Sequence, residues 1–523
     1  MEKFGARNNI GKQRKRKKTS EGIDYISHLP EEIILHVLSF LPIKELTVVS
    51  LLSNLWKYMV VSHLSKVPSS LNLDEPDMIR NFITRSIYQQ ECAVYHRSSR
   101  PPRSLHHVVR LARKHYMDFV NRTLLLHSGC TINDLHFCFC YDGSDGYKKR
   151  INSWLRFALT NNIKEIELDF SEGELHRSNA LVQPYEFPLG CFSPRMLNTL
   201  ILKYCKLRAL CFGVLRSLQR LCLQQVKILK CSIGEIVSKC PILEEVSLEY
   251  CTFPNDFMVN KRDMKIKRLS LIECQTVDWP MFAINISVPD LSMLTIVGRY
   301  LMTSRIRKAV HLLDVIIDIN QLYADHVQGD ALGSLLNGLS HSQTLILTTW
   351  CIQVLPTGEN LLHQLPIPLQ NLKHLKLVVG LVKQELPGIS CLLRSCPNLE
   401  NLTLEMQEPF NVDWAEFEED IPDILNFEEH SYWELQNLPF SCLQNYLKQI
   451  KISGFTGRTN EMQMIRFLLE NAGVLEKMEI YHSPQQEIDS TGFQDNLHHL
   501  LNLPRASPRA QMEIFTNFQF NNM

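Results

Sequence analysis

The side chains that most often carry catalysis or bind metals occur here without the spacing that such chemistry requires. The sequence has no glycine-rich phosphate-binding loop, no His-Glu-x-x-His zinc motif and no Gly-x-Ser-x-Gly nucleophile turn. Its 16 cysteines include no Cys-x-x-Cys pair. We therefore expect a protein that is not an enzyme and that needs neither a cofactor nor a metal.

A few histidines and cysteines have the right type for metal binding, but their spacing favours other roles. His136, Cys138 and Cys140 alternate within an apolar run and have no second ligand pair, so we interpret them as part of a buried strand. The pairs His106-His107 and His498-His499 are adjacent in sequence and point to different sides of a helix, which favours surface positions.

The net charge is zero, from 55 basic and 55 acidic residues, but the charges are segregated. Residues 405–434 contain eleven acids and no Lys or Arg, in a spacing that fits no calcium loop, so we expect a solvated linker. Residues 12–18 form a basic run, which indicates either a nuclear import signal or a tail that aids solubility. The remainder is mildly acidic, which argues against nucleic-acid binding.

No apolar run is long enough to span a membrane, and no secretory apolar segment follows the N-terminus. The cysteines are scattered through strand-like apolar runs, which indicates reduced, mostly buried thiols. We therefore expect the protein in the nucleus, the cytoplasm or both.

The segment from residue 24 to 58 has more apolar surface than its helices can bury alone. Pro30 suits the start of a helix, and an apolar face follows at the helical period up to Pro42, which ends the helix. Two further short helices are predicted to follow. A unit of roughly 40 residues is below the usual size for independent stability, so this surface is expected to pack on a partner. The alternative is an ordinary helical cap of the downstream domain.

This segment resembles an F-box. The ordered pattern is Leu-Pro-x-Glu at 29–32, Leu-Ser-Phe-Leu-Pro at 38–42 and Leu-Ser-x-x-Trp-Lys at 52–57. Asn54 and Leu55 stand where plant members usually have a basic pair. The resemblance implies docking on a Skp-type adaptor, which joins the chain to a cullin–RING ubiquitin ligase. The implied contacts are Leu29, Pro30, Ile33, Ile34, Val37, Leu38, Leu41, Pro42, Val49, Leu52 and Trp56.

Most of the remaining chain repeats one pattern, Leu-x-x-Leu-x-Leu, with a period of a leucine-rich repeat. The last residues of successive copies, Leu202, Leu223, Leu248, Leu271 and Ile296, are 21, 25, 23 and 25 residues apart. The pattern predicts a solenoid of parallel strands with helical or irregular returns, and its register is uncertain between 296 and 377. A doubly wound α/β domain is the alternative, but most gaps are too short for its helices.

The chain is predicted to divide into an F-box (21–62), a helical linker (63–131), a solenoid (132–410), an acidic linker (411–434) and a C-terminal unit (435–505). A basic tail (1–20) and a second tail (506–523) flank them, and an exposed loop is expected near 97–103. The C-terminal unit reads as strand, helix and strand, with Asn460 and Gln463 as a capping box, and it resembles the FBD domain of plant F-box/repeat proteins.

These features together resemble the plant F-box/FBD/leucine-rich-repeat family. The resemblance implies a non-catalytic receptor of a Skp–cullin–F-box ubiquitin ligase, whose repeats hold an unknown target protein. A non-degradative repeat scaffold and a receptor that needs a small molecule remain alternatives. The outward-facing target contacts predicted from the repeats are Gln219, Arg220, Glu245, Arg268, Lys373 and Lys376.

Overall fold

The computed structural model describes residues 29–66, 69–78, 80, 105–127, 132–139, 141, 143–160, 163–171, 183–187, 196–208, 215–229, 232–260, 264–277, 283–299, 304–307, 309–320, 326–358, 363–410, 424–436, 438–483, 496 and 498–515. The chain forms two compact units. The helical unit comprises Met1–Ser69 and Met117–Thr131, and the repeat unit comprises Ser70–Tyr116 and Ile132–Met523. The predicted loop near 97–103 and the basic tail lie outside the described residues.

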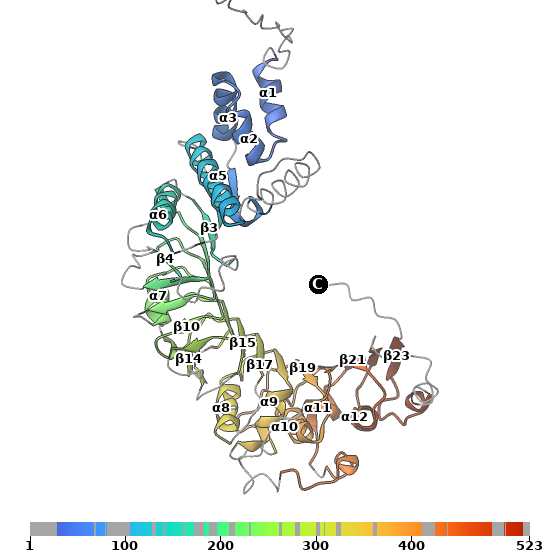
Figure 1. Cartoon of the computed structure of the whole chain (residues 1–523). Helices are drawn as coiled ribbons and strands as arrows, with labels where there is room; N and C mark the ends of the chain where they lie inside the picture. The colour runs from blue at the N-terminus through green and yellow to red at the C-terminus, as the bar shows by residue number, and fades with distance from the viewer. Residues whose placement is uncertain are drawn as a thin grey trace, which may run out of the picture. The chain divides into compact units, whose positions relative to one another are not determined.

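Three short helices build the helical unit, as the sequence predicts. They are α1 (Glu31–Leu38), α2 (Ile43–Val49) and α3 (Asn54–Lys66), joined by the last turns of α5 (Leu105–Leu126) (Figure 1). Pro30 and Pro42 directly precede α1 and α2, where the backbone N–H that proline lacks would have no helical partner. The core consists of Ile34, Leu38, Leu46, Met59, Val60, Leu64 and Leu126.

The repeat unit is built on one sheet of 15 described strands, whose order follows the chain. From β2 to β23, each strand of this sheet pairs in parallel with the next. This order confirms the predicted solenoid and excludes a doubly wound sheet, in which the strand order reverses. The strands are β1 (Ser69–Asp74), β2 (Ile132–Cys138), β3 (Glu165–Asp169), β5 (Thr199–Lys203), β7 (Arg220–Gln224), β9 (Glu245–Glu249), β12 (Arg268–Ile272), β15 (Met293–Gly298), β17 (Asp314–Ile319), β18 (Thr344–Thr348), β19 (His374–Val379), β20 (Asn401–Met406), β21 (Gln449–Phe455), β22 (Lys477–His482) and β23 (Gln511–Phe515).

Side chains alternate between the two faces of this sheet. The Leu and Ile positions of the repeat point to the core, where Leu200, Leu221, Val246, Leu269 and Leu294 stack in register and are buried. The intervening positions form the other face, which we call the strand face. Each coil therefore covers its neighbour's apolar edge, and stability comes from stacking.

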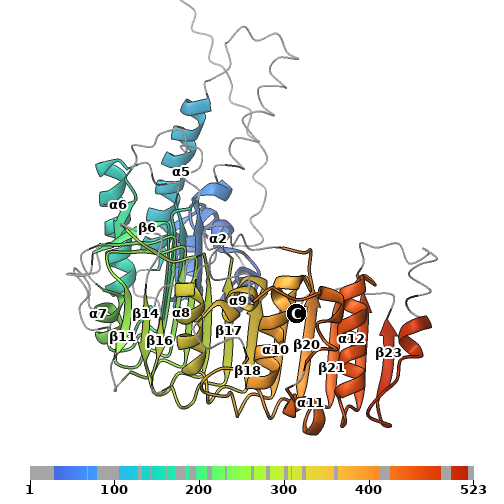
Figure 2. The ribbon, with the colours of Figure 1, turned by 90° about the horizontal axis from the view of Figure 1, so that it is seen from below.

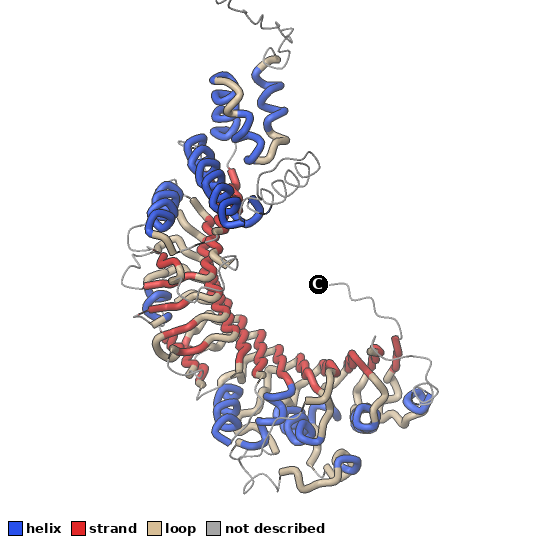
Figure 3. The backbone as a smooth tube through the Cα atoms, viewed as in Figure 1, coloured by secondary structure: helices blue, strands red, loops and turns tan. Residues whose placement is uncertain are grey.

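The core face is covered in two different ways, which Figure 3 shows by colour. Between β4 and β16 the returning chain forms short strands: a five-stranded sheet ordered β13-β10-β8-β6-β4 and a three-stranded sheet ordered β11-β14-β16. Further along, helices replace these strands, and α8, α10 and α12 run beside the main strands (Figure 2). These elements are β4 (Tyr185–Phe187), β6 (Cys205–Arg208), β8 (Lys227–Leu229), α7 (Ile233–Ser238), β10 (Thr252–Phe253), β11 (Phe257–Asn260), β13 (Gln275–Thr276), β14 (Ile284–Ser287), β16 (Arg305–Ile306), α8 (His326–Asn337), α9 (Thr349–Val354), η4 (Leu355–Thr357), η5 (Lys383–Glu385), α10 (Leu386–Ser395), η6 (Glu429–Ser431), α11 (Ser441–Asn445) and α12 (Thr459–Asn471).

Four repeats share a turn that places a non-glycine residue in the left-handed region. Tyr204, Gln225, Tyr250 and Glu273 each directly follow a main strand and have φ between 48° and 56°. The backbone N–H of each donates to the carbonyl of the next coil, as from Tyr250 to Ile272 at 2.7 Å. This contact offsets the strain of the left-handed backbone. The turn directs the following side chain inward, which explains the buried residues Cys205, Val226, Cys251 and Cys274.

The buried thiols agree with the sequence prediction. Among the cysteines that the structure describes, all are free thiols and all but Cys222 are buried. The Sγ of Cys251 donates to the Leu223 carbonyl at 3.3 Å, and that of Cys274 donates to the Leu248 carbonyl at 3.4 Å. These thiols therefore satisfy carbonyls between coils. Within the described residues, no helix combines the length and the hydropathy that a membrane span requires.

The N-terminal end of the repeat unit is closed by α5, α6 (Asp145–Thr160) and a buried polar network. The Glu75 carboxylate accepts a hydrogen bond from Arg113 Nε at 2.8 Å and another from the Tyr147 hydroxyl. The Tyr116 hydroxyl donates to the Leu73 carbonyl at 2.8 Å. Burial and the neighbouring Glu75 carboxylate raise the pKa of Tyr147 well above its ordinary value. Beside this network, the aromatic rings of Phe137, Phe139, Tyr147, Trp154, Phe170 and Tyr185 pack together.

Three predicted segments differ from the structure. The region 63–131 is not only helical, because it contributes β1, in which Leu71 and Leu73 are buried. The region 506–523 contains β23, which pairs with β22. Both strands are short and stand alone in sequence, so the repeat pattern did not reveal them.

The third difference is in the acidic region. Residues 411–423 lie outside the described part, but 424–434 pack against the repeats and are not a solvated linker. Trp433 stacks on Phe467 with ring centroids 4.4 Å apart, and the hydroxyls of Tyr432 and Ser390 are 2.8 Å apart. The aromatic residues between the acids provide apolar surface that the charge count conceals.

The predicted capping box at α12 is also wrong. Asn460 lies inside the helix, and its amide nitrogen donates to the Leu381 carbonyl at 2.9 Å. Glu461 instead holds the turn before the helix, because its carboxylate accepts from the backbone N–H groups of Thr456 and Gly457 at 2.8 and 2.9 Å. The Glu461 carboxylate, in the first turn of α12, therefore fixes the turn that precedes the helix.

A buried carboxylate between β19 and α10 makes the stability of this region depend on pH. Glu385 is fully buried and accepts from the backbone N–H groups of Gly380 and Val382 at 3.3 and 3.1 Å. Burial raises its pKa to about 7, although these hydrogen bonds oppose the change. The folded state therefore holds this proton more tightly than the unfolded state, and stability should fall as pH rises from about 4.5 to 7.

We expect that Glu385→Gln removes roughly 2–3 kcal/mol of this pH dependence, because one pKa unit corresponds to about 1.4 kcal/mol. Hydrogen exchange of β19 and α10 at pH 5 to 8 measures the local opening free energy in both proteins. If the native chain and the variant lose protection equally as pH rises, the assignment to Glu385 is wrong.

Candidate functional site

The helical unit exposes an unusual amount of apolar surface. Leu29, Ile33, Val37 and Phe40 follow the helical period and form one stripe along α1, and a second exposed group comes from α2 and α3. Ile33 is 48% exposed, Phe40 72% and Leu52 67%. Exposed apolar surface of this density usually marks an interaction site. We call it the apolar face, and it consists of Leu29, Pro30, Ile33, Val37, Phe40, Pro42, Val48, Leu51, Leu52, Leu55 and Tyr58.

The core beneath this face holds the exposed side chains in place. Ile34 and Leu38 alternate with Ile33 and Val37 on α1 but point to the interior, where they pack with α3. A polar contact adds to this packing: the hydroxyls of Thr47 and Thr123 are 3.2 Å apart, and both side chains are buried. The helical unit therefore has a core of its own, so its exposed apolar residues are not needed to hold it together.

The structure divides the residues that the F-box resemblance assigned to the adaptor. Leu29, Pro30, Ile33, Val37, Pro42 and Leu52 are exposed. Leu41, Val49 and Trp56 are half-buried against the core. Ile34 and Leu38 are 2% and 0% exposed, so the expectation that they contact an adaptor is corrected: they support the surface from within. A wide apolar stripe can contain both core residues and surface residues. The helical period alone does not show which residues of the stripe are buried and which are exposed.

Sequence analysis missed five residues of the apolar face. They are Phe40, Val48, Leu51, Leu55 and Tyr58. Phe40 belongs to the quoted Leu-Ser-Phe-Leu-Pro pattern and could have been included. The others lie near the junction of α2 and α3, where the turn at residues 50–53 breaks the helical period.

The predicted target contacts lie on or beside the strand face. Arg220, Glu245 and Arg268 occupy the same register position on β7, β9 and β12, and Lys376 lies on β19. Gln219 and Lys373 directly precede β7 and β19. Their assignment to a target stays a prediction.

The charged members of this set are paired with one another or with close neighbours. Glu245 Oε2 accepts from Arg220 Nε at 3.1 Å and from Arg268 Nη2 at 2.6 Å. Partial burial opposes ionisation, but the two guanidinium groups keep the pKa of Glu245 below its ordinary value. Lys373 and Lys376 pair with Glu400 and Glu405 at 2.9 and 2.5 Å. Exposed pairs of this kind contribute little stability, but they leave little free charge for a partner.

The structure does not bring together the histidines and cysteines that could have bound a metal. His136 lies on the strand face, and its Nδ1 is 3.1 Å from Glu167 Oε2, whereas Phe137 and Phe139 point into the aromatic core. Cys140 and the side chains of His106 and His107 lie outside the described part, and His498 and His499 are exposed. Within the described ranges, no group of three His, Cys, Asp or Glu residues is arranged to hold a metal ion.

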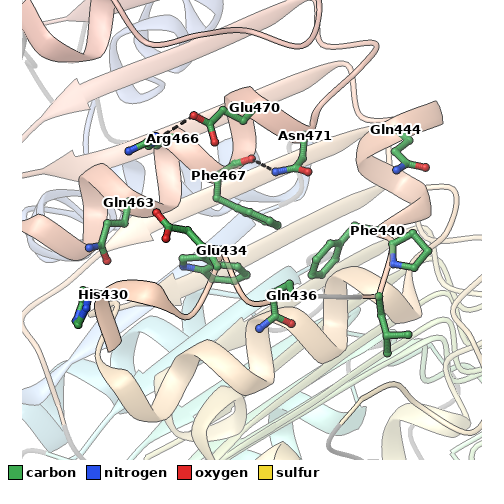
Figure 4. Close-up of a pocket in the computed structure, with 13 residues that line it drawn as sticks. His430, Glu434, Gln436, Phe440, Gln444, Gln463, Arg466, Phe467, Glu470 and Asn471 are labelled. Atoms are coloured by element: carbon green, nitrogen blue, oxygen red, sulfur yellow. Dashed lines mark hydrogen bonds and ion pairs between the residues drawn. The ribbon is translucent and has the colours of Figure 1, made fainter. Parts of the chain in front are cut away.

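A pocket of about 450 Å³ lies beside α12. Among the residues that line it, Phe440 and Phe467 meet edge to face with ring centroids 5.2 Å apart, and Arg466 pairs with Glu470 at 2.9 Å (Figure 4). Gln463 and Glu434 also line it. Its lining comes from residues 430–444 and from α12, and none of it comes from the strand face. A ligand bound there would therefore lie apart from a target held on the strands.

Comparison with known sequences gives two family matches. An F-box domain matches residues 26–67, and a domain described as "At1g61320/AtMIF1, LRR domain" matches residues 123–501. Among Arabidopsis thaliana proteins, the chain is 25% identical to the FBD-associated F-box protein At5g27750 over 91% of this chain and 96% of that protein. It is 24% identical to the F-box/FBD/LRR-repeat protein At4g03220 (88% and 89%) and 26% identical to the F-box/LRR-repeat protein At3g58940 (90% and 67%). The LRR match runs through β21 and β22, in agreement with a C-terminal unit that continues the same sheet.

Proposed function

Because the chain belongs to the family of plant F-box proteins with an LRR domain of the At1g61320/AtMIF1 type, we propose that it is the substrate-recognition subunit of a Skp–cullin–F-box ubiquitin ligase. The helical unit binds a Skp-type adaptor, the adaptor connects the chain to a cullin, and the repeats hold a target protein.

The apolar face of the helical unit is the observation that carries this proposal. Its residues are exposed although the unit has a core of its own. Leaving such side chains in water costs about 25 cal/mol for each Å² that a partner would cover. The alternative, a cap for the downstream domain, gives no reason for this exposure. Binding to an adaptor that has a complementary apolar groove explains why these side chains are exposed.

The chain would then act by proximity and not by its own chemistry. A target held on the repeats meets the ubiquitin-charged enzyme at a raised effective concentration, so its lysines react faster without any group of this chain taking part. The basic run at residues 12–18 supports a nuclear as well as a cytoplasmic location.

The first test is complex formation between the full chain and a purified plant Skp-type adaptor. We expect a 1:1 complex in size-exclusion chromatography with light scattering, and a ternary complex when the cullin is added. If the two proteins elute separately at concentrations up to about 10 μM, the receptor role is wrong.

A second measurement separates a ligase receptor from a repeat scaffold. Proteins that bind the repeats are identified in cells that express the chain with or without residues 29–66, and their half-lives are compared. Longer half-lives on loss of the helical unit support the ligase. Unchanged half-lives, with binding retained, support the scaffold.

A further inference from the structure

The middle of the strand face is apolar, although both ends of that face carry charges. Five outward side chains form a contiguous patch on four neighbouring strands, which we call the central lane: Ile272 (β12), Met293 and Val297 (β15), Ile316 (β17) and Ile346 (β18). Ile272 is directly opposite Val297, and Ile316 is directly opposite Ile346. Ser270 and Thr295 continue the row of Ile316, so small side chains complete the lane.

Burial and alternation show that these residues are not part of the core. Each is half-buried, whereas the residues between them, such as Leu294, Val315 and Leu345, are buried completely. The corresponding positions on β3 are Glu165, Glu167 and Asp169, which are acidic. Single aliphatic side chains also face outward on β5 (Ile201) and β19 (Val378), but the central lane gathers five of them on four neighbouring strands. Such a gathering favours contact with a partner.

Two carboxylates of β17 lie on this face, one on each side of Ile316. Asp318, directly opposite Val297, accepts a hydrogen bond from the Thr348 hydroxyl at 2.9 Å. Asp314 lies on β17 between Met293 and Thr344, two residues from Ile316 on the same face. Its side chain is exposed, and among the described residues its carboxylate has no hydrogen-bond or ion-pair partner. The charges on either side of the lane are already paired: Arg268 binds Glu245, and Lys376 binds Glu405. Asp314 is thus a negative charge left for a ligand.

We propose that the central lane binds an extended segment of the target protein that carries an aliphatic residue and a Lys or Arg two positions apart. The aliphatic side chain covers Ile316 and Ile346, and the basic side chain reaches Asp314. Alternate residues of an extended chain are roughly 7 Å apart, so a partner segment running along β17 matches the distance between Ile316 and Asp314. This inference rests on the proposed function, because it specifies the target that the receptor would accept.

The test uses the full chain and a phage-displayed library of random 12-residue peptides. We expect enriched peptides to share an aliphatic residue and a basic residue two positions apart. A synthetic peptide with this consensus, measured by fluorescence anisotropy, should bind Ile316→Ser and Ile346→Ser at least 10-fold more weakly. Asp314→Lys should lose the peptide and gain the version in which Glu replaces the basic residue.

Asp134→Lys is the matched control, since Asp134 occupies the same register row on the distant strand β2. It should leave the affinity unchanged, and the thermal unfolding of each variant shows whether the repeats remain folded. No enrichment, a consensus without the aliphatic–basic spacing, or equal binding by Asp314→Lys would overturn the inference. Self-association that Ile316→Ser abolishes would also overturn it, in favour of a second copy of the chain.

Adaptor binding is measured on the same preparations, so the two proposals fail separately. If the chain binds the adaptor but selects no peptide, the proposal for the central lane is wrong and the receptor role stands. If the chain selects peptides but does not bind the adaptor, the receptor role is wrong and the central lane stands as a peptide-binding surface.

Discussion

Replacement of Ile33 by aspartate is expected to weaken binding of a Skp-type adaptor at least 100-fold. Ile33 lies in the middle of the exposed stripe on α1, and its side chain does not belong to the core of the helical unit. A carboxylate placed in an apolar interface without a partner costs several kcal/mol, and 100-fold corresponds to about 2.7 kcal/mol. Isothermal titration of the purified chain with the adaptor measures the change.

Leu125→Asp provides the matched control. Leu125 is 74% exposed and belongs to the same helical unit, but it lies near the end of α5 and outside the apolar face. The same substitution there should change adaptor affinity less than threefold. Ile34→Ala serves as a second comparison, because it opens a cavity in the core and should lose binding together with the helical structure of the unit. If Ile33→Asp binds as tightly as the native chain, the adaptor uses another surface.

The repeat pattern was sufficient to predict most strands of the sheet, but not β1 and β23. Each Leu-x-x-Leu-x-Leu copy placed its last two leucines in the core, as at Leu221 and Leu223, because a period of two can bury only one face. The pattern could not predict how the chain returns. Between β4 and β16, short strands form where helices or irregular segments were expected. The returning chain must only cover an apolar edge, and several conformations do so.

The composition of the strand face was harder to predict than the core. Ile316 and Ile346 come from repeats whose register was uncertain in the sequence, 30 residues apart, and only the pairing of β17 with β18 places them side by side. The sequence predicts the charged residues Arg220 and Arg268 as target contacts, yet both pair with Glu245. Which charge is free depends on neighbours across strands, and a single sequence does not give that information.

The second large effect is expected at the closed end of the repeat unit. Glu75→Ala should lower the free energy of unfolding by roughly 3–5 kcal/mol, because it removes the carboxylate from a buried ion pair and leaves the Arg113 charge behind. The Tyr147 hydroxyl loses the same acceptor. Hydrogen exchange of β1, β2 and β3 during urea titration measures the loss, since a repeat array can unfold in segments.

Two further variants decide whether the broken ion pair between Glu75 and Arg113 is the cause. Glu75→Leu combined with Arg113→Met removes both charges and should recover much of the loss, because a buried ion pair replaced by apolar side chains is often neutral. Glu400→Ala breaks the half-exposed pair with Lys373 and should change stability by less than about 1 kcal/mol. A loss at Glu75→Ala no larger than at Glu400→Ala would mean that packing of the aromatic rings, and not this ion pair, closes the end of the solenoid. A double variant as unstable as Glu75→Ala would assign the loss to the tyrosine and backbone contacts around residue 75.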